Sequence, residues 1–189
     1  WLNKGVKKSL ENGQAEYVTT TGTNYDRMTL IRPPFFLMKQ YFKIWQAHPE
    51  LKKSWNEGCM RLSLTTIRAT QHVTKSQDPT VAERTFAKRA LYLNKKEDLY
   101  DLDKNDTLRI LKEIKDHSPY HLDGDPFYLA YLVKKLKKYK LWDAFPKPQT
   151  VIHAYEFCTK NVSDYLKKEL GCPVINLFGS TELGFLFST

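Results

Sequence analysis

The spacing of apolar positions along the chain predicts alternating strands and helices. Strands are predicted where apolar and β-branched residues form short runs, at residues 16–21, 60–66, 91–93, 150–155, 173–178 and 185–187. Helices are predicted at residues 35–45, 78–90 and 159–170, in a segment that begins at Asp103 or Asp106, and in one that begins behind Asp125. This order, without an internal repeat, indicates an α/β fold with a layered mixed β-sheet flanked by helices.

Several of the predicted helices carry clear end signals. Asp78 and Asp125 each precede a proline, and this pair is typical of an N-cap followed by proline at the first helical position. Thr159 is the expected cap of a later helix. Gly171 is expected to end that helix, because glycine accepts the left-handed backbone of a C-terminal cap, and Pro173 prevents its continuation.

Several predicted helices also have a face that we expect to be buried. These faces consist of Leu108, Leu111 and Ile114, of Leu129, Leu132, Val133 and Leu136, and of Val162, Tyr165, Leu166 and Leu170. The helix at 35–45 is expected to be mostly buried, because core-like spacing is found for Phe35, Phe36, Tyr41, Phe42 and Trp45. A stacking platform for nucleic acid is therefore not expected there.

Composition narrows the class of protein further. The chain has 189 residues, of which 41% are hydrophobic, and this excludes a disordered chain and fits about one domain. Its 30 Lys and Arg against 21 Asp and Glu give a net charge of +9, which suits an anionic ligand, a nucleic acid or an acidic partner without choosing among them. No segment approaches the roughly 18 apolar residues of a membrane span. Three cysteines without a C-x-x-C pair favour a reducing compartment, and we expect a cytoplasmic protein.

Two predicted loops follow strands and carry residues suited to phosphate chemistry. The first, at residues 19–24, holds four threonine hydroxyls, an amide and Gly22, and Arg27 follows it closely. Such a loop can turn backbone N–H groups towards an anion. The second, at residues 176–184, places Glu182 just past a strand and beside two hydroxyls, which is typical of a Mg²⁺ and phosphate position. Taken singly, each loop is equally compatible with an ordinary polar turn.

Together, the two loops resemble the signatures of the adenylate-forming superfamily, which includes acyl-CoA synthetases, peptide-synthetase adenylation domains and luciferases. The second signature of that family reads Tyr-Gly-x-Thr-Glu, and here the sequence is Phe178-Gly179-Ser180-Thr181-Glu182. The preceding order is similar to the branch of phenylacetate–CoA ligases and capsule-biosynthesis proteins. It consists of a strand that ends at an acidic residue, a helix, the run Gly171-Cys172-Pro173-Val174, and then the signature. The resemblance covers about residues 15–187.

The resemblance implies a role for each matching residue. The β- and γ-phosphates of ATP would be cradled by Thr20, Thr21, Gly22 and Thr23. The remaining nucleotide and acyl contacts would come from Tyr155, Glu156, Phe178, Gly179 and Ser180, with Phe178 on the adenine. Thr181 would donate to the α-phosphate and Glu182 would hold Mg²⁺.

The implied reaction is ATP-dependent activation of a carboxylic acid. An acyl-adenylate and pyrophosphate form first, and the acyl group then passes to a thiol such as coenzyme A. The resemblance also implies that residues 1–189 are an internal part of a large N-terminal AMP-binding domain, because the family's ribose-binding Asp, hinge and C-terminal Lys have no counterpart here. We therefore expect no turnover from these residues alone.

The phosphate loop departs from the family pattern. Where the family continues with Thr, Gly and a later Lys, this chain has Asn24, Tyr25, Asp26 and Arg27. Tyr25 does not copy the conformational freedom of glycine, and Asp26 adds negative charge near the triphosphate. Arg27 is the candidate replacement for the lysine, although its planar fork differs from an ammonium point charge.

Three alternatives remain open at this stage. The altered loop favours a degenerate family member that acts as a binding protein, and acyl transfer to a protein or an amino acid would keep the protein an enzyme. A basic nucleic-acid-binding domain is the third alternative, suggested by Lys134, Lys135, Lys137, Lys138 and Lys140. These lysines fall on the solvent side of an amphipathic helix, so we do not expect nucleic-acid binding from their spacing.

Overall fold

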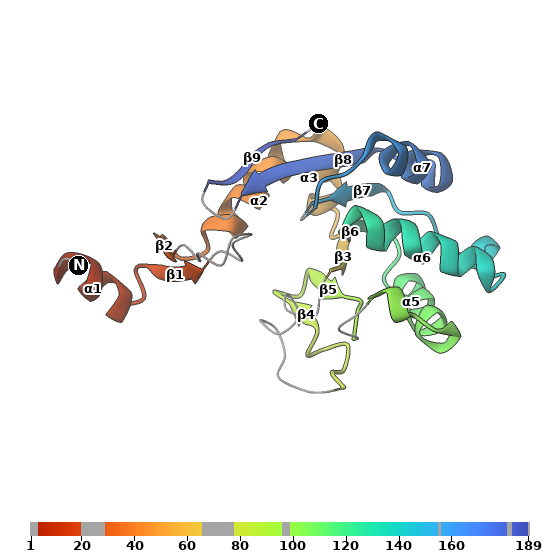
Figure 1. The fold of residues 1–189 in the computed structure, drawn as a ribbon, viewed down its shortest axis with the longest axis horizontal. Helices are drawn as coiled ribbons and strands as arrows, with labels where there is room; N and C mark the ends of the chain where they lie inside the picture. Colours follow the sequence, from red (N-terminus) through yellow and green to blue (C-terminus); the bar gives the residue numbers. More distant parts are fainter. Residues whose placement is uncertain are drawn as a thin grey trace. The chain divides into compact units, whose positions relative to one another are not determined.

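The computed structural model of the chain describes residues 4–19, 29–65, 78–95, 99–154, 156–180 and 183–188 (Figure 1). The chain forms two compact units. The first unit comprises Trp1–His48 and Phe178–Ser188, and the second comprises Pro49–Leu177. Among the described helices, none is both long enough and apolar enough to cross a membrane.

A mixed β-sheet forms the centre of the second unit. Its strands lie in the spatial order β4-β5-β3-β6-β7-β8. Their bounds are β3 (Met60–Leu64), β4 (Thr85–Phe86), β5 (Ala90–Tyr92), β6 (Tyr120–Gly124), β7 (Thr150–His153) and β8 (Val174–Ser180), the last three residues of β8 belonging to the first unit. Strand β4 is antiparallel to β5, whereas β5, β3, β6, β7 and β8 pair in parallel. The predicted α/β architecture with a mixed sheet is therefore confirmed.

The order of the parallel strands reverses between β3 and β6. The chain proceeds from β3 to its neighbour β5 on one side, and then continues with β6, β7 and β8 on the other side (Figure 1). In open α/β sheets, ligands bind outside the carboxyl ends of the strands at such a reversal. The carboxyl ends of β3 and β6 are therefore where the fold of the second unit predicts a binding site.

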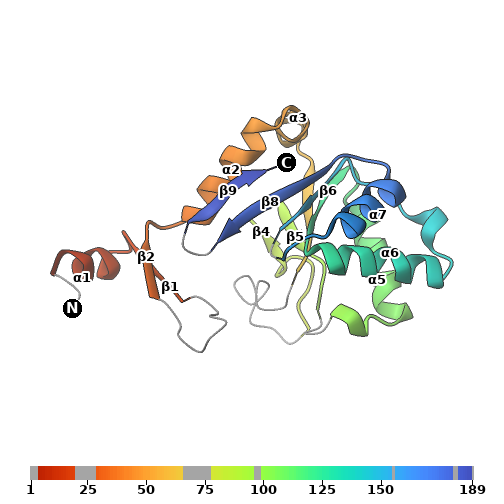
Figure 2. The same ribbon diagram turned by 45° about the horizontal axis from the view of Figure 1, so that its top comes forward.

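Three helices cover one face of this sheet (Figure 2). The helices of the second unit are α3 (Pro49–Asn56), α5 (Lys104–Asp116), α6 (Pro126–Lys138) and α7 (Lys160–Leu170), with short 3₁₀ turns η1 (Leu99–Asp101) and η2 (Trp142–Ala144). The apolar core lies between the sheet and helices α5, α6 and α7, where Leu62, Leu64, Leu122 and Val151 point from the strands. Every second strand residue points this way because side chains alternate along a strand.

The predicted caps of these helices are confirmed. Asp103 caps α5 and forms a reciprocal capping box with Asp106. The carboxylate of Asp125 accepts from the first backbone N–H groups of α6, and Thr159 caps α7. Gly171 ends α7 in the left-handed conformation, with φ of 62°. The beginnings of α5, α6 and α7 and the end of α7 thus follow from local sequence signals.

The prediction of a helix at residues 78–90 is wrong. In its place the chain makes turns and the short strand β4, because Arg84 is fully buried and binds groups outside its own segment. Its guanidinium donates to both carboxylate oxygens of Glu113, at 2.7 and 3.1 Å, and to the carbonyl of Tyr92 at 2.5 Å. Strand β6 was not predicted at all, and Leu108 is 41% exposed although a buried position was predicted for it.

The first unit contains two helices, a hairpin and a strand. Their bounds are α1 (Lys4–Glu11), β1 (Glu16–Thr19), β2 (Thr29–Arg32), α2 (Phe36–Ala47) and β9 (Gly184–Ser188). Strands β1 and β2 pair antiparallel, and Arg32 Nε lies 2.8 Å from Glu16 Oε1 across the pair. The prediction of a mostly buried helix at 35–45 is only partly right, because Trp45 is buried but Phe35 and Phe42 are 61% and 47% exposed.

We expect Thr159→Ala to lower the free energy of unfolding by about 1 kcal/mol, because it removes the hydroxyl that accepts from Val162 N at 3.4 Å. Thr159→Ser keeps that acceptor and should lose only a few tenths of this amount. Urea denaturation of both variants measures the difference. Equal losses for the alanine and serine variants would contradict a capping role.

Candidate functional site

The candidate site of the second unit lies where β3 and β6 end. The backbones approach closely there, since the Asp125 N–H donates to the Leu64 carbonyl at 3.3 Å. A Cβ atom at position 124 would lie only 2.1 Å from the same carbonyl oxygen, so this contact requires glycine. The two strand ends are therefore held together by backbone contact.

Asp125 is the first side chain beyond this contact. Its carboxylate is 7% exposed and accepts from Phe127 N at 2.8 Å and from Tyr128 N at 3.3 Å. Burial raises the pKa of Asp125, and the nearby charge of Glu156 acts in the same direction, whereas the two backbone donors oppose the shift. Asp125 thus serves α6 as its cap, which limits its freedom to act on a ligand.

The next strand end, that of β7, carries the predicted pair Tyr155 and Glu156. Tyr155 lies outside the described residues, whereas the Glu156 side chain is exposed. Cys158 lies close by, and burial, together with the charge of Asp125, raises the pKa of its thiol. This part of the edge consequently holds the buried carboxylate of Asp125, the exposed one of Glu156 and the Cys158 thiol.

The sheet face opposite the three helices carries polar side chains. Arg61 and Ser63 of β3 alternate with core leucines, and His121 and Asp123 of β6 alternate in the same way. The strand register pairs Arg61 with His121, Ser63 with Asp123, and His121 with Thr150 of β7. Parallel sheets normally bury apolar residues on both faces, so this polar face is a departure that the predicted strands did not reveal.

An ion pair organises this polar face. Arg61 donates to Asp123 Oδ2 through Nε at 2.8 Å and also through Nη2. Asp123 is 1% exposed, and a buried carboxylate needs such a partner because burial alone strongly disfavours its charge. The period-two alternation of Arg61-Leu62-Ser63-Leu64 and His121-Leu122-Asp123 is the sequence signal that would have identified the face.

His121 lies fully buried on the same face. Burial lowers the pKa of its imidazole to about 4, so the ring is neutral at pH 7. The hydroxyls of Ser63 and Thr150 are also buried, and neither has a hydrogen-bond partner in the described structure. The face therefore holds neutral donors and acceptors beside a compensated ion pair.

In the first unit, the predicted signature begins on β8. Phe178 is 48% exposed, Gly179 is exposed, and Ser180 is partly buried. The strand continues through Ser180, two residues beyond the end that was predicted for it at residue 178. Thr181 and Glu182, the predicted α-phosphate and Mg²⁺ residues, lie outside the described residues.

The residues on both sides of Thr181 and Glu182 are fixed by contacts within the first unit. Ser180 Oγ accepts from Leu183 N at 3.2 Å, and Gln40 Nε2 of α2 donates to the Leu183 carbonyl at 3.4 Å. Gly184 has φ of +72°, and a Cβ atom there would lie 1.9 Å from Gln40 Oε1. Sequence reasoning missed Gln40, because no motif connects it with a strand more than 140 residues away.

The predicted phosphate loop follows β1, whose pairing with β2 is described up to Thr19 opposite Thr29. Thr20, Thr21, Gly22, Thr23 and Arg27 lie outside the described residues. Their predicted approach to Glu182 therefore stays a prediction. Likewise, no cluster of three or more His, Cys, Asp or Glu residues suited to a metal ion occurs in the described parts of the chain.

Comparison with known proteins gives weak likenesses. No family model matches the chain. No curated protein sequence matches it either. Among solved structures, a 2-hydroxyisobutyryl-CoA ligase in the postadenylation state, in complex with R3-HIB-AMP, has a TM-score of 0.49 and 12% identity over 90% of this chain and 33% of its own.

Two further solved structures also have a low level of similarity to this chain. An open conformation of that ligase, in complex with 2-HIB-AMP and CoA, has a TM-score of 0.48 and 15% identity over 89% of this chain and 37% of its own. A luciferase-like enzyme from the nonluminescent Zophobas morio mealworm has a TM-score of 0.44 and 13% identity over 91% of this chain and 36% of its own. The chain spans about a third of the length of these structures, and likeness at this level assigns neither a family nor an activity.

We expect Gly184→Ala to destabilise the protein more than Gly13→Ala. Both glycines have left-handed φ values, +72° and +66°, so both substitutions incur a backbone cost of about 1 kcal/mol. A Cβ added at Gly184 would also meet the Gln40 side chain at 1.9 Å and the Phe36 ring at 2.9 Å, whereas one added at Gly13 has nothing within 4 Å. Chemical denaturation measures the free energies of unfolding.

The double variant Gly184→Ala with Gln40→Ala isolates the contact. Removing the glutamine side chain should restore part of the stability that the alanine at position 184 loses. Equal losses at positions 13 and 184, without recovery in the double variant, would contradict the contact between α2 and the start of β9.

The buried imidazole of His121 predicts a dependence of stability on pH. Because its pKa is about 4 in the folded state and about 6.5 when unfolded, the unfolded chain binds more protons between these values. Stability should be fully present above pH 6.5 and should fall as the pH decreases towards 4. The pKa of His153 is also lowered, chiefly by burial, and adds a loss of the same sign.

The variant His121→Gln tests this assignment because it keeps a polar side chain that does not titrate. Its free energy of unfolding, measured from pH 7.5 to 4.5, should fall less steeply than that of the unaltered protein. Parallel pH curves for the two proteins would show that His121 is not the titrating group.

Proposed function

We propose that the protein of which this chain is part activates a carboxylic acid with ATP and then transfers the acyl group to a thiol such as coenzyme A. One observation carries the proposal. The run Phe178 to Glu182 of the family resemblance begins on strand β8, and strand β7, helix α7 and the Gly171 turn precede it in the order that the resemblance requires.

The exposed end of β8 supports the proposed nucleotide contact. The Phe178 ring is about half exposed, and the neighbouring Gly179 adds no side chain that would cover it. A flat heterocycle such as adenine can pack on such a ring. In the proposal, Phe178 holds the adenine, and Tyr155 and Glu156 line the nucleotide and acyl pocket.

The proposed chemistry needs little covalent participation by the protein. A carboxylate oxygen of the substrate attacks the α-phosphorus of ATP, the bond from the α-phosphorus to the bridging oxygen breaks, and pyrophosphate leaves. Thr20, Thr21, Gly22 and Thr23 hold the β- and γ-phosphates, and Thr181 donates to the α-phosphate. Positioning and neutralisation of charge supply the rate enhancement.

Mg²⁺ would neutralise negative charge on the phosphates when bound. Glu182 has the carboxylate oxygens that this ion prefers, and Arg27 adds a positive charge close to the threonine loop. In the second half-reaction a thiolate attacks the acyl carbon, AMP leaves, and a thioester forms. The substrate is a small carboxylic acid whose identity a panel of acids would reveal.

Pyrophosphate exchange into ATP tests the first half-reaction. We expect the complete protein to show acid-dependent exchange with at least one member of a panel of aryl and aliphatic acids. Glu182→Gln should reduce this exchange by at least 100-fold, an effect on the order of that found when one transition-state contact is removed. Glu57→Gln is the control, because Glu57 is an exposed residue paired only loosely with Lys53, at 3.9 Å.

The outcomes separate the proposal from its main alternative. Exchange that Glu182→Gln leaves unchanged would overturn the role of this residue. Saturable ATP binding without pyrophosphate exchange in the presence of any acid of the panel would instead favour a degenerate family member that binds nucleotide. The altered residues Asn24, Tyr25 and Asp26 suggest this alternative.

A further inference from the structure

Helix α6 carries a large excess of positive charge on its solvent side. Residues 126–140 contain five lysines and no Asp or Glu. Leu129, Leu132, Val133 and Leu136 are buried as predicted, and the lysines take the remaining sides, with Lys134, Lys137 and Lys138 exposed. The structure thus confirms the solvent-side position of the lysines. It also shows which side chains lie beside them.

Aromatic rings lie between these lysines. The Lys135 ammonium group is 5.0 Å from the Tyr131 ring centroid and 5.8 Å from that of Tyr139, and Lys138 is also 5.8 Å from Tyr139. Tyr100, which is 49% exposed, packs edge-on against Tyr131 at 5.2 Å. Rings and ammonium groups therefore form one continuous stripe along α6.

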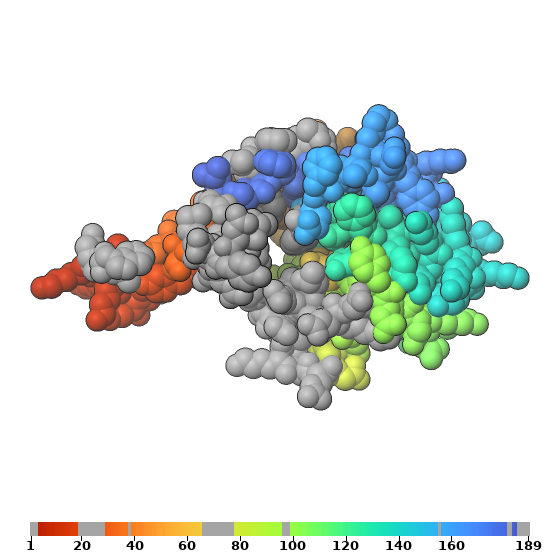
Figure 3. Space-filling view, viewed as in Figure 1, coloured from red at the N-terminus to blue at the C-terminus, as the bar shows by residue number. Residues whose placement is uncertain are grey.

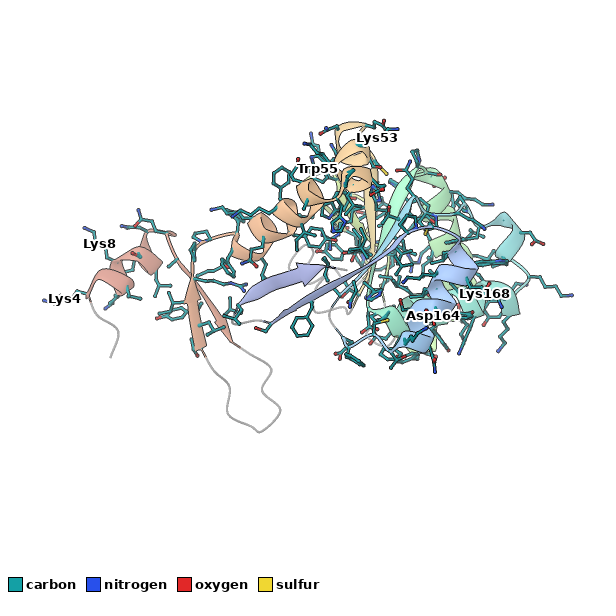
Figure 4. All side chains as sticks on the ribbon, turned by 90° about the horizontal axis from the view of Figure 1, so that it is seen from above. Lys4, Lys8, Lys53, Trp55, Asp164 and Lys168 are labelled. Atoms are coloured by element: carbon teal, nitrogen blue, oxygen red, sulfur yellow. The ribbon has the colours of Figure 1, made fainter. Side chains whose placement is uncertain are left out.

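An ion pair connects the last turn of α6 with the neighbouring helix. Lys137 Nζ lies 2.5 Å from Glu169 Oε2, and this pair joins the last turn of α6 to the last turn of α7. Lys167 and Lys168 occupy that turn of α7, and Figure 4 labels Lys168 there. In Figure 3 the side chains of this part of the second unit project from the right-hand end of the surface. The last turns of α6 and α7 therefore carry further lysines, although Glu169 neutralises Lys137.

We propose that this surface, defined as the α6 stripe with Tyr100, Tyr131, Lys134, Lys135, Lys138, Tyr139 and Lys140, binds single-stranded nucleic acid. A single strand offers phosphates to the lysines and unpaired bases to the tyrosine rings, and this pairing of groups is the usual basis of sequence-independent single-strand binding. The proposal is independent of the ligase activity proposed above.

Two simpler explanations of the stripe, stabilisation of the helix and docking to a membrane, account for fewer of its features. Lysines in the last turn of a helix interact favourably with its dipole, but this does not explain the tyrosine rings beside them. A membrane-docking helix inserts apolar side chains between lipids. Here the exposed large apolar groups described at this stripe are aromatic, and three lysine–tyrosine contacts place ammonium groups over the rings.

Fluorescence anisotropy with a labelled mixed-sequence DNA 20-mer tests the proposal at several salt concentrations. The unaltered protein should bind with a steep dependence on salt. The variant with Lys134, Lys135, Lys138 and Lys140 all changed to Gln should bind at least 10-fold more weakly. Its slope of log K against log salt should fall by roughly 0.7 for each lost phosphate contact.

The matched control changes Lys4, Lys7, Lys8 and Lys53 to Gln, which removes the same charge from α1 and α3 (Figure 4). This control should retain near-normal affinity. Tyr100→Leu should weaken binding about 5-fold or more without changing the salt slope, because a base loses its stacking partner and no phosphate contact is lost. Thermal unfolding confirms that each variant is folded.

Four outcomes would overturn the proposal. They are absence of salt-dependent binding, equal weakening in the control and the stripe variant, unchanged affinity in Tyr100→Leu, and tighter binding to phosphatidylserine vesicles or polyglutamate than to the oligonucleotide. The last outcome would assign the surface to an anionic membrane or to an acidic protein partner.

Discussion

The parallel pairing of β3 with β6 is the constraint from which the arrangement of the second unit follows. The register places Leu62 beside Leu122 and Ser63 beside Asp123, so one face of both strands is apolar and the other is polar. A shift by one residue would turn the leucines away from α5, α6 and α7 and expose the core. The contact of Gly124 with Leu64 then fixes where the two strands end.

This register forces a charged pair into a nearly dry position. Once Leu62 and Leu122 face the helices, Arg61 and Asp123 must occupy the opposite face, where Asp123 is almost fully buried. Buried ion pairs contribute little net stability, but leaving either partner alone is strongly unfavourable. The pair therefore reinforces the register, because a shifted pairing of β3 and β6 would separate the almost fully buried Asp123 from Arg61, whose side chain is 18% exposed.

The sequence predicted most of the helices of the second unit because their ends are local. Asp103, Asp125, Thr159 and Gly171 act within a few residues of the helix that each one caps, and no tertiary contact is needed to recognise them. The same signal at Asp78 gave a wrong helix. There, the long-range contacts of Arg84 with Glu113 and with the Tyr92 carbonyl override the local preference.

The candidate site was predictable only in part, because some of its residues are brought together by contacts between segments that lie far apart in the sequence. The residues of the family resemblance are contiguous in sequence, so Phe178 to Glu182 could be identified without any coordinates. Gln40 has no such context, because its position depends on which helix packs against β9. His121 begins a run, His121 to Pro126, that resembles the loop before a helix in the family, and the resemblance did not indicate that this run forms the strand paired with β3. Strand β6 escaped prediction since His121-Leu122-Asp123-Gly124 is short, polar at alternate positions and followed at once by a helix cap.

The two ends of helix α6 belong to the two different proposals made for this protein. Its first residues are capped by Asp125 at the strand ends of the candidate site, and its last turn carries Lys135, Lys137 and Lys138. A negative charge at the start and positive charges at the end both stabilise a helix through its dipole, so the charges alone do not distinguish stability from function.

The aromatic rings distinguish a role in helix stability from a role in binding. Tyr100 and Tyr139 contribute nothing to the dipole interaction. Tyr139 lies beside Lys135 and Lys138, whereas Tyr100 is 49% exposed and packs against other tyrosine rings, which leaves aromatic surface in water that a stacked base would cover. A function for the α6 stripe therefore depends on its tyrosines, and the lysines decide how strongly a bound strand responds to salt.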